Sequence, residues 1–149
     1  LQGALGLVQL SKLEYAIKTQ RENKKIIKDS LGDIKKCKFR AFADEDGETG
    51  DTIVLIFDRS EDAKVFVKNI RDKGLGTKNL PDAFNWHFAG TWDHMFSEIK
   101  SYKNNSWKVL WKKSEDLLRR TVALPINIKM SNEQIEKMIN VIRGALQTL

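Results

Sequence analysis

Ile53-Val54-Leu55-Ile56-Phe57 is the stretch of this sequence that decides its fold class, because apolar residues follow one another there without a polar break. A strand with one exposed face alternates apolar and polar side chains, whereas a strand covered on both faces reads as a continuous apolar run. The run therefore predicts a strand in the centre of a sheet.

The segment directly after this strand has the pattern of an amphipathic helix. Its apolar residues recur at positions i, i+3, i+4 and i+7, which places them on one helix face. Ser60 is suited to be the N-cap of this helix, and Gly74 to be a left-handed C-cap. The predicted buried face consists of Ala63, Phe66, Val67 and Ile70.

Upstream of the central strand, residues 36–43 alternate basic and apolar side chains and predict a second strand with one buried face. This alternation points Cys37 inward. Asp and Gly residues within 44–50 predict the turn that joins the two strands.

Residues 1–31 carry apolar residues near helical spacing and predict one or two long helices. Gly3 and Gly6 each weaken a helix by about 1 kcal/mol relative to Ala. Their presence suggests close packing of this segment against a neighbouring element, and its apolar residues predict an exposed apolar surface along 1–13 when that neighbour is missing.

Downstream of the first helix the pattern is less regular. Residues 80–102 are rich in aromatic side chains and predict a loop with a short helix near 93–100. Apolar spacing then predicts another helix over 107–118. Residues 122–128 alternate as a strand, in which Pro125 favours a sheet edge or a bulge because it has no N–H to donate.

The last segment begins with Ser131 and Gln134, which fit a capping box. The helix that follows has an apolar stripe at helical spacing: Ile135, Met138, Ile139, Ile142 and Leu146. All these elements together predict a small α/β domain of α+β arrangement, with a sheet of three to four largely antiparallel strands covered by helices and preceded by a long N-terminal helix.

The composition is that of an ordinary globular domain in a reducing compartment. The chain has 149 residues, a net charge of +6 and a single cysteine, which cannot form an internal disulfide. It begins without a signal-peptide pattern and contains no long apolar run, so we expect a cytoplasmic protein with no membrane partner. The lysines are spread among acidic residues and read as a solvated face.

Common catalytic motifs are missing from the sequence, including a Walker loop, a nucleophile elbow, paired CxxC motifs and HExxH. His87 and His94 are too far apart along a helix to share one metal ion, so no metal site is predicted. Cys37 is expected to be a buried and unreactive thiol, because strand alternation sends the neighbouring lysines to the opposite face.

The segment 79–95 concentrates aromatic, histidine, proline and glycine residues in a loop-like stretch. One interpretation is a site for a polar ring-shaped ligand, with aromatic faces for the ring and imidazole or amide groups for its hydroxyls. The other is an aromatic mini-core beneath a long loop. Both hold together if Phe84, Phe88 and Phe96 pack while His87 and Trp92 face a cleft.

Trp107 and Trp111, with lysines beside them, raise the alternative of a stand-alone binding module for single-stranded nucleic acid or for a protein partner. Tryptophans four residues apart on an amphipathic helix are more often part of a core. The sequence alone leaves this alternative open.

Three segments in order, Leu1–Leu10, Ile70–Thr77 and Ala123–Ser131, resemble the C-terminal third of sugar aminotransferases of the DegT type. This resemblance implies a fold-type I enzyme that uses pyridoxal phosphate. It also implies that residues 1–31 form a linking helix from a cofactor domain and that residues 32–149 form the C-terminal small domain. The aromatic segment is similar to that of aminotransferases that make 8-amino-3,8-dideoxy-octulosonate, a component of bacterial lipopolysaccharide.

The resemblance implies the following roles. The lysine that binds the cofactor lies outside this chain, which has no assigned catalytic residue and is inactive by itself. The expected substrates are a keto sugar and glutamate as amino donor; a homodimer is expected, and no nucleic acid. The expected substrate-binding residues are His87, Trp86, Trp92, Thr77 and Lys78, the last as a partner for a sugar carboxylate. The sequence departs from the family pattern at Leu75 and Lys78, where Ile and Arg are usual.

Overall fold

The computed structural model describes residues 1–32, 34–100 and 107–149, and for residues 107 and 108 it describes the backbone only. Its sheet contains β1 (Cys37–Phe39), β2 (Thr52–Phe57) and β3 (Thr121–Pro125) in the order β1-β2-β3, and both pairs are antiparallel. The prediction that residues 53–57 form a central strand is confirmed. The mixed fold class, with a small antiparallel sheet covered by helices, is confirmed as well.

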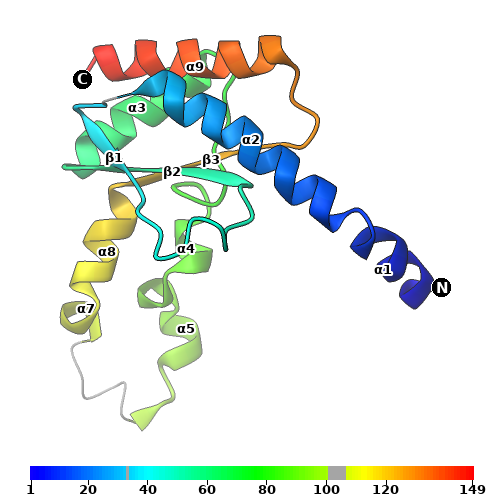
Figure 1. The fold of residues 1–149 in the computed structure, drawn as a ribbon. Helices are drawn as coiled ribbons and strands as arrows, with labels where there is room; N and C mark the ends of the chain where they lie inside the picture. Colours follow the sequence, from blue (N-terminus) through cyan, green and yellow to red (C-terminus); the bar gives the residue numbers. More distant parts are fainter. Residues whose placement is uncertain (33, 101–106) are drawn as a thin grey trace.

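Three long helices cover one side of the sheet (Figure 1): α2 (Leu13–Leu31), α3 (Ser60–Asp72) and α9 (Asn132–Gln147). On this side β2 contributes three fully buried residues at every second position: Ile53, Leu55 and Phe57. The predicted stripe of α9 is buried too, and so is the predicted face of α3. The apolar patterns of the strand and of the two helices therefore meet in one core.

The opposite face of β2 is only half-buried, at Val54 and Ile56. We expected this strand to be covered on both faces, and the structure corrects that expectation. Short helices lie on this side and extend away from the sheet (Figure 1): α4 (Phe84–His87), α5 (Asp93–Phe96), α7 (Trp107–Leu110) and α8 (Lys112–Arg119). The predicted helix over 107–118 is interrupted at Trp111, where a turn separates α7 from α8.

The ends of α3 show how sequence signals act locally. The N-cap is Arg59, with an extended backbone, and Ser60 is the first helical residue, so the predicted cap was displaced by one position. At the other end, Gly74 has φ +79, and the amide groups of Gly74 and Leu75 donate to the carbonyls of Arg71 and Ile70 at 2.8 and 2.9 Å. This is the Schellman arrangement that a C-terminal glycine predicts.

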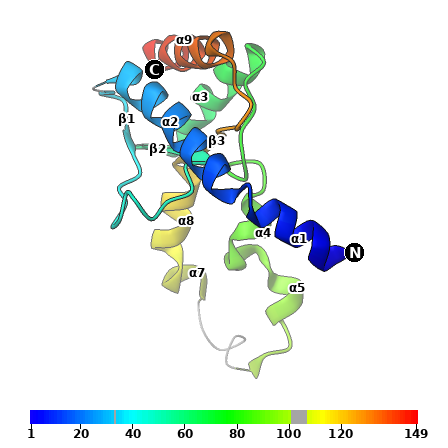
Figure 2. The same cartoon turned by 45° about the vertical axis from the view of Figure 1, so that its right-hand side comes forward.

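The N-terminal segment forms two helices, and two residues, Ser11 and Lys12, separate α1 (Gln2–Leu10) from α2. Figure 2 shows α1 extending away from the rest of the domain, and none of its residues is buried. Nothing lies within 4 Å of a Cβ placed on Gly3 or Gly6. The predicted apolar surface is thus exposed, at Leu1, Leu5, Leu7, Val8, Leu10 and Leu13.

The C-terminal part follows the sequence pattern closely. β3 ends at Pro125 and lies at the sheet edge, as the proline predicts, although the strand is shorter than the expected 122–128. Ser131 and Gln134 form the capping box through two hydrogen bonds of 2.9 and 3.2 Å. In the described part of the chain, no helix has the length and apolar character needed to cross a bilayer.

Candidate functional site

The turn after α3 carries two of the residues expected to bind substrate, Thr77 and Lys78. Its backbone pairs with the outer edge of β3, because the Lys78 N–H donates to the Ala123 carbonyl at 2.8 Å and the Ala123 N–H donates to the Leu80 carbonyl at 3.1 Å. These bonds occupy the edge of the sheet and fix the turn beside it. The two side chains are therefore carried by a well-defined backbone.

Both side chains already have protein partners. Thr77 donates to the Asp82 carboxylate, which also accepts from Arg71. Lys78 donates to Asp51, which also accepts from the Thr49 hydroxyl at 2.9 Å. The hydrogen bond from Lys78 holds the pKa of Asp51 below its usual value, and the bond from Thr77 does the same for the pKa of Asp82.

The pairing with Asp51 changes what Lys78 offers to a ligand. The ammonium is neutralised by a neighbouring carboxylate, and both side chains remain partly exposed. A ligand carboxylate that approached Lys78 would also meet the negative charge of Asp51. Sequence reasoning missed Asp51 and Asp82, because no local pattern links Asp51 to a lysine 27 positions later.

The other expected residues lie on the segment that contains α4, the 3-10 helix η1 (Ala89–Thr91) and α5. A surface hollow of about 490 Å³ opens on this segment. We call it the aromatic hollow, and its lining consists of Asn85, Trp86, Thr91, Trp92, His94 and Met95. The structure therefore brings Trp86 and Trp92 to the same hollow.

Hydrogen bonds hold the walls of the aromatic hollow in place. The Trp92 indole N–H donates to the Asn85 carbonyl at 2.7 Å, and the Thr91 hydroxyl lies 2.9 Å from the same oxygen. The Trp92 ring also stacks on Phe96, with centroids 6.2 Å apart and planes 12° apart. Because its ring is anchored on two sides, Trp92 is a fixed wall of the hollow.

The two histidines occupy different positions. His94 lines the aromatic hollow, whereas His87, the last residue of α4, is exposed and does not belong to the lining. Sequence reasoning chose His87 from its place in the loop. No local spacing singles out His94, because residues two positions apart on a helix do not share a face, and its place beside Trp92 depends on how the short helices turn.

The predicted aromatic mini-core is present in part, because Phe84 and Phe88 pack together whereas Phe96 stacks on Trp92. Phe88 is buried and lies 5.3 Å from Phe84 between ring centroids, and the Arg119 guanidinium stacks over Phe84 at 4.5 Å. The contact with Arg119 joins the segment to α8. A Cβ on Gly90 would lie 2.2 Å from the Phe88 ring, so a side chain at this position is sterically excluded.

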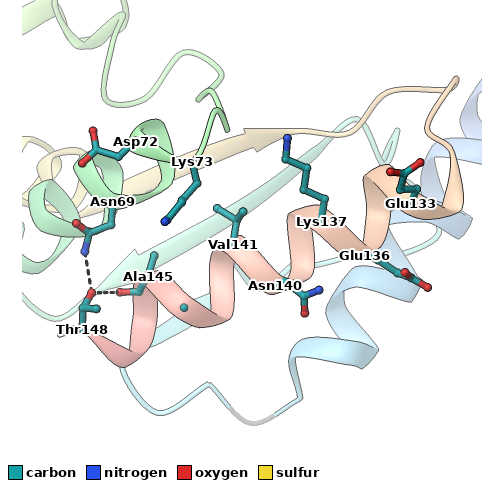
Figure 3. Close-up of a pocket in the computed structure, with 11 residues that line it drawn as sticks. Asn69, Asp72, Lys73, Glu133, Glu136, Lys137, Asn140, Val141, Ala145 and Thr148 are labelled. Carbon is teal, nitrogen blue, oxygen red and sulfur yellow. Dashed lines mark hydrogen bonds between the residues drawn. The ribbon is translucent and has the colours of Figure 1, made fainter.

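A second hollow, of about 810 Å³, lies between α3 and α9 (Figure 3). Val141 and Ala145 lie on the side of α9 that faces α3, and Lys73 extends from the end of α3 toward α9. Both acidic and basic side chains line it: Asp72, Lys73, Glu133, Glu136 and Lys137. This mixture defines no preferred charge for a ligand, and none of the expected site residues lies here.

No group of three or more His, Cys, Asp or Glu side chains in the described residues is arranged to hold a metal ion.

Cys37 is buried in the core, as predicted, and burial raises the pKa of its thiol to about 12. A thiol with this pKa carries almost no thiolate near neutral pH.

A model of the DegT/DnrJ/EryC1/StrS aminotransferase family matches residues 1–143. PseC of Helicobacter pylori, an aminotransferase involved in the biosynthesis of pseudoaminic acid, has a TM-score of 0.74 and 14% identity over 99% of this chain and 37% of its own. The aminotransferase TlmJ of Streptoalloteichus hindustanus has a TM-score of 0.71 and 16% identity over 96% of this chain and 35% of its own.

Spr1654 of Streptococcus pneumoniae, solved in its PMP form, has a TM-score of 0.70 and 13% identity over 97% of this chain and 34% of its own. At these identities the likeness shows a shared fold. The chain spans about a third of the length of the structures it matches.

Proposed function

Because the chain belongs to the DegT/DnrJ/EryC1/StrS aminotransferase family, we propose that it is the C-terminal part of a pyridoxal-phosphate-dependent enzyme that moves an amino group from glutamate to a keto sugar. The match of the family model to residues 1–143 is the observation that carries this proposal. Residues 1–31 serve as the link to a cofactor domain, and residues 32–149 serve as the small domain on the substrate side.

The cofactor lysine belongs to the remainder of the protein. When bound, pyridoxal phosphate supplies an electron sink for the carbon that loses a proton, and it is held through a lysine amine. Among the lysines whose side chains are described, only Lys24 is buried, and its ammonium lies 2.5 and 2.6 Å from the two carboxylate oxygens of Glu48. This amine is committed to an ion pair and the other described lysines are at least partly exposed, so the described residues offer no buried, unpaired amine that fits the cofactor. The PMP form of Spr1654 supports the identity of the cofactor.

The contribution of this chain is recognition of the sugar. Trp86 and Trp92 offer aromatic surface in the hollow, and His87, the residue after Trp86, adds an exposed imidazole. Thr77 and Lys78 stand on the preceding turn, where Lys78, paired with Asp51, meets a polar end of the substrate. We propose more specifically that the product is 8-amino-3,8-dideoxy-octulosonate and that the enzyme acts in lipopolysaccharide biosynthesis in the cytoplasm.

The exposure of helix α1 supports the proposal that this chain is part of a longer protein that forms a homodimer. Its apolar side chains point in several directions, and Leu1, Leu7 and Leu10 are more than half exposed. A helix of this kind is usually covered in the complete protein. In the proposed enzyme, the cofactor domain and the second protomer cover it.

Transamination by the full-length protein tests the proposal. We expect the protein with pyridoxal phosphate to release more than one equivalent of 2-oxoglutarate per cofactor from glutamate only when a keto sugar accepts the amino group. His87→Ala should lower kcat/KM for the sugar about tenfold to a hundredfold, which is about 1.4 to 2.7 kcal/mol, and leave the half-reaction with glutamate unchanged. Residues 1–149 alone should give neither turnover nor a borohydride-trapped cofactor adduct. Absence of turnover with every keto sugar tested would contradict the proposal.

The structure gives no specific support to the nucleic-acid alternative. Trp111 is half-buried at the break between α7 and α8, and the side chain of Trp107 lies outside the described part of the chain. A stacking platform needs exposed aromatic faces beside basic residues. The described residues present exposed tryptophan at Trp86, and no basic side chain belongs to the lining of that hollow.

A further inference from the structure

We propose that the aromatic hollow binds an uncharged sugar ring and that His94 is the residue that recognises the hydroxyl groups of this ring. The inference rests on the proposed function and specifies its substrate: the part of the keto sugar held here carries no phosphate or carboxylate.

The first argument is the chemistry of the lining. Two tryptophans, a methionine, an asparagine, a threonine and a histidine form it, so no Asp, Glu, Lys or Arg takes part. Indole faces pack against the C–H faces of a sugar ring, while amide and imidazole groups form hydrogen bonds with its hydroxyls. A phosphate or carboxylate would need cationic partners, which this lining does not offer.

The second argument is the exposure of Trp86 beside a fixed Trp92. Trp86 is 82% exposed, an unusual state for the largest apolar side chain, whereas Trp92 is held by the Asn85 carbonyl and by Phe96. One wall is thus rigid and the other is open to a ligand. A volume of about 490 Å³ lies within the range of about 300 to 1,000 Å³ that is usual for small-molecule sites.

The third argument concerns the position of His94. It is the one titratable residue of the lining, and a neutral imidazole has both a donor and an acceptor nitrogen. A sugar hydroxyl also donates and accepts, so the two groups match. The charged pair Lys78 and Asp51 stands on a different turn, which separates recognition of a charged end from recognition of the ring.

Kinetics of the full-length enzyme with its cofactor test the role of His94. We expect His94→Ala to raise KM for the keto sugar about tenfold to a hundredfold, with the glutamate half-reaction unchanged. His94→Gln keeps a donor and an acceptor and should recover most of the loss. Asp93→Asn is the matched control, because Asp93 is an exposed neighbour on α5 that does not line the hollow.

A pair of probes tests the preference for an uncharged ring. Methyl α-D-glucopyranoside and methyl α-D-glucuronide have the same ring and differ by a carboxylate. The neutral glycoside should compete with the keto sugar, and the glucuronide should compete more weakly. Trp86→Ala should abolish this competition, whereas Trp86→Phe should preserve it.

The outcomes separate this inference from the proposed function. If the enzyme transaminates keto sugars but His94→Ala behaves like Asp93→Asn, the inference is wrong and the function stands. Equal inhibition by both glycosides, or slowing of both half-reactions by His94→Ala, also overturns it. If no keto sugar is transaminated while the neutral glycoside still binds in a Trp86-dependent way, the proposed function fails and the hollow remains a sugar site.

Discussion

The sheet with α2, α3 and α9 differs in kind from the extension formed by residues 84–119. In the first region apolar residues are fully buried and lie beside residues far away in the sequence, as Leu55 does beside its strand partner Val122. Among the described side chains of the extension, within 84–100 and 109–119, only Phe88 is buried, and six large apolar side chains are exposed: Trp86, Met95, Ile99, Val109, Leu110 and Leu117. Burial of apolar side chains stabilises the first region, whereas the second region leaves apolar surface exposed.

The difference shows which forces shape each region. Burial of a continuous apolar face determines the core, because each buried side chain contributes about 1.5 to 3 kcal/mol. The extension depends on short hydrogen bonds and ring contacts, such as Trp92 to Asn85 and Arg119 to Phe84. Binding residues commonly lie on such segments, held by a rigid scaffold.

The largest expected effect comes from a cavity in the core. Phe66→Ala should lower the free energy of unfolding by about 3 to 5 kcal/mol, because a fully buried ring is lost. Val65→Ala is the control, since Val65 is 45% exposed on the same helix and should change stability by less than about 1 kcal/mol. Chemical denaturation followed by circular dichroism measures both. Equal effects would mean that α3 is not packed on the sheet.

A buried ion pair ties α2 to the loop before β2, and removing its acid should have the next largest effect. Glu48→Gln leaves the Lys24 ammonium without its partner, and we expect a loss of about 3 kcal/mol. Burial lowers the pKa of Lys24 and the bond to Glu48 opposes this effect, so the variant should favour the neutral amine. Glu45→Gln, which removes an exposed pair with Lys28, should cost less than about 1 kcal/mol. A similar loss in both variants would contradict the structural assignment.

Gly90→Ala tests the packing of the extension. The new Cβ would collide with the Phe88 ring, and we expect a cost of about 1 to 3 kcal/mol that is confined to residues near the aromatic hollow. Hydrogen exchange by residue should show opening of α4 and α5 while the sheet stays protected. Gly144→Ala is the matched control, because its Cβ meets nothing within 4 Å inside α9 and should stabilise by about 0.5 to 1 kcal/mol. Loss of protection in the sheet of Gly90→Ala would show that the two regions unfold together.

The smallest effect concerns the turn that lies between the two regions. The pKa of Asp51 is lowered by Lys78, so the carboxylate stabilises the fold above its ordinary pKa of about 3.9, and this contribution disappears as the pH falls through the lowered value. Asp51→Asn should therefore reduce stability at neutral pH by under about 1 kcal/mol and make it less dependent on pH in the acid range. Thermal unfolding between pH 2 and 7 compares the variant with the parent. An unchanged acid profile would mean that the pair does not form in solution.

Local patterns were sufficient for the core elements. The spacing of Ala63, Phe66 and Ile70 predicted α3 and its buried face, and Gly74 predicted its end. The same holds for α9 with its capping box and for β3 at the sheet edge, where Pro125 lacks a donor. These features depend on residues within one or two helical turns, so sequence spacing contains them.

The candidate site was predictable only in part. The sequence indicated an aromatic ligand site in 79–95 and placed Trp86 and Trp92 in it, and the structure shows both at one hollow. It could not choose between His87 and His94, because the choice depends on how α4, η1 and α5 turn relative to one another. The sequence also could not show that one face of β2 is only half-buried, because the exposure of Val54 and Ile56 depends on which segments pack against them.

The sequence by itself determined the fold class, the family resemblance, the central place of residues 53–57 in the sheet and the buried, unreactive state of Cys37. Each follows from periodicity, from turn residues or from short motifs that act between neighbours in the chain. Only the tertiary structure decided that Lys78 is paired with Asp51, that Lys24 is paired with Glu48, and that His94 lines the hollow. Charges and rings interact through space over a few ångströms, so these partners are set by packing between segments far apart in the sequence.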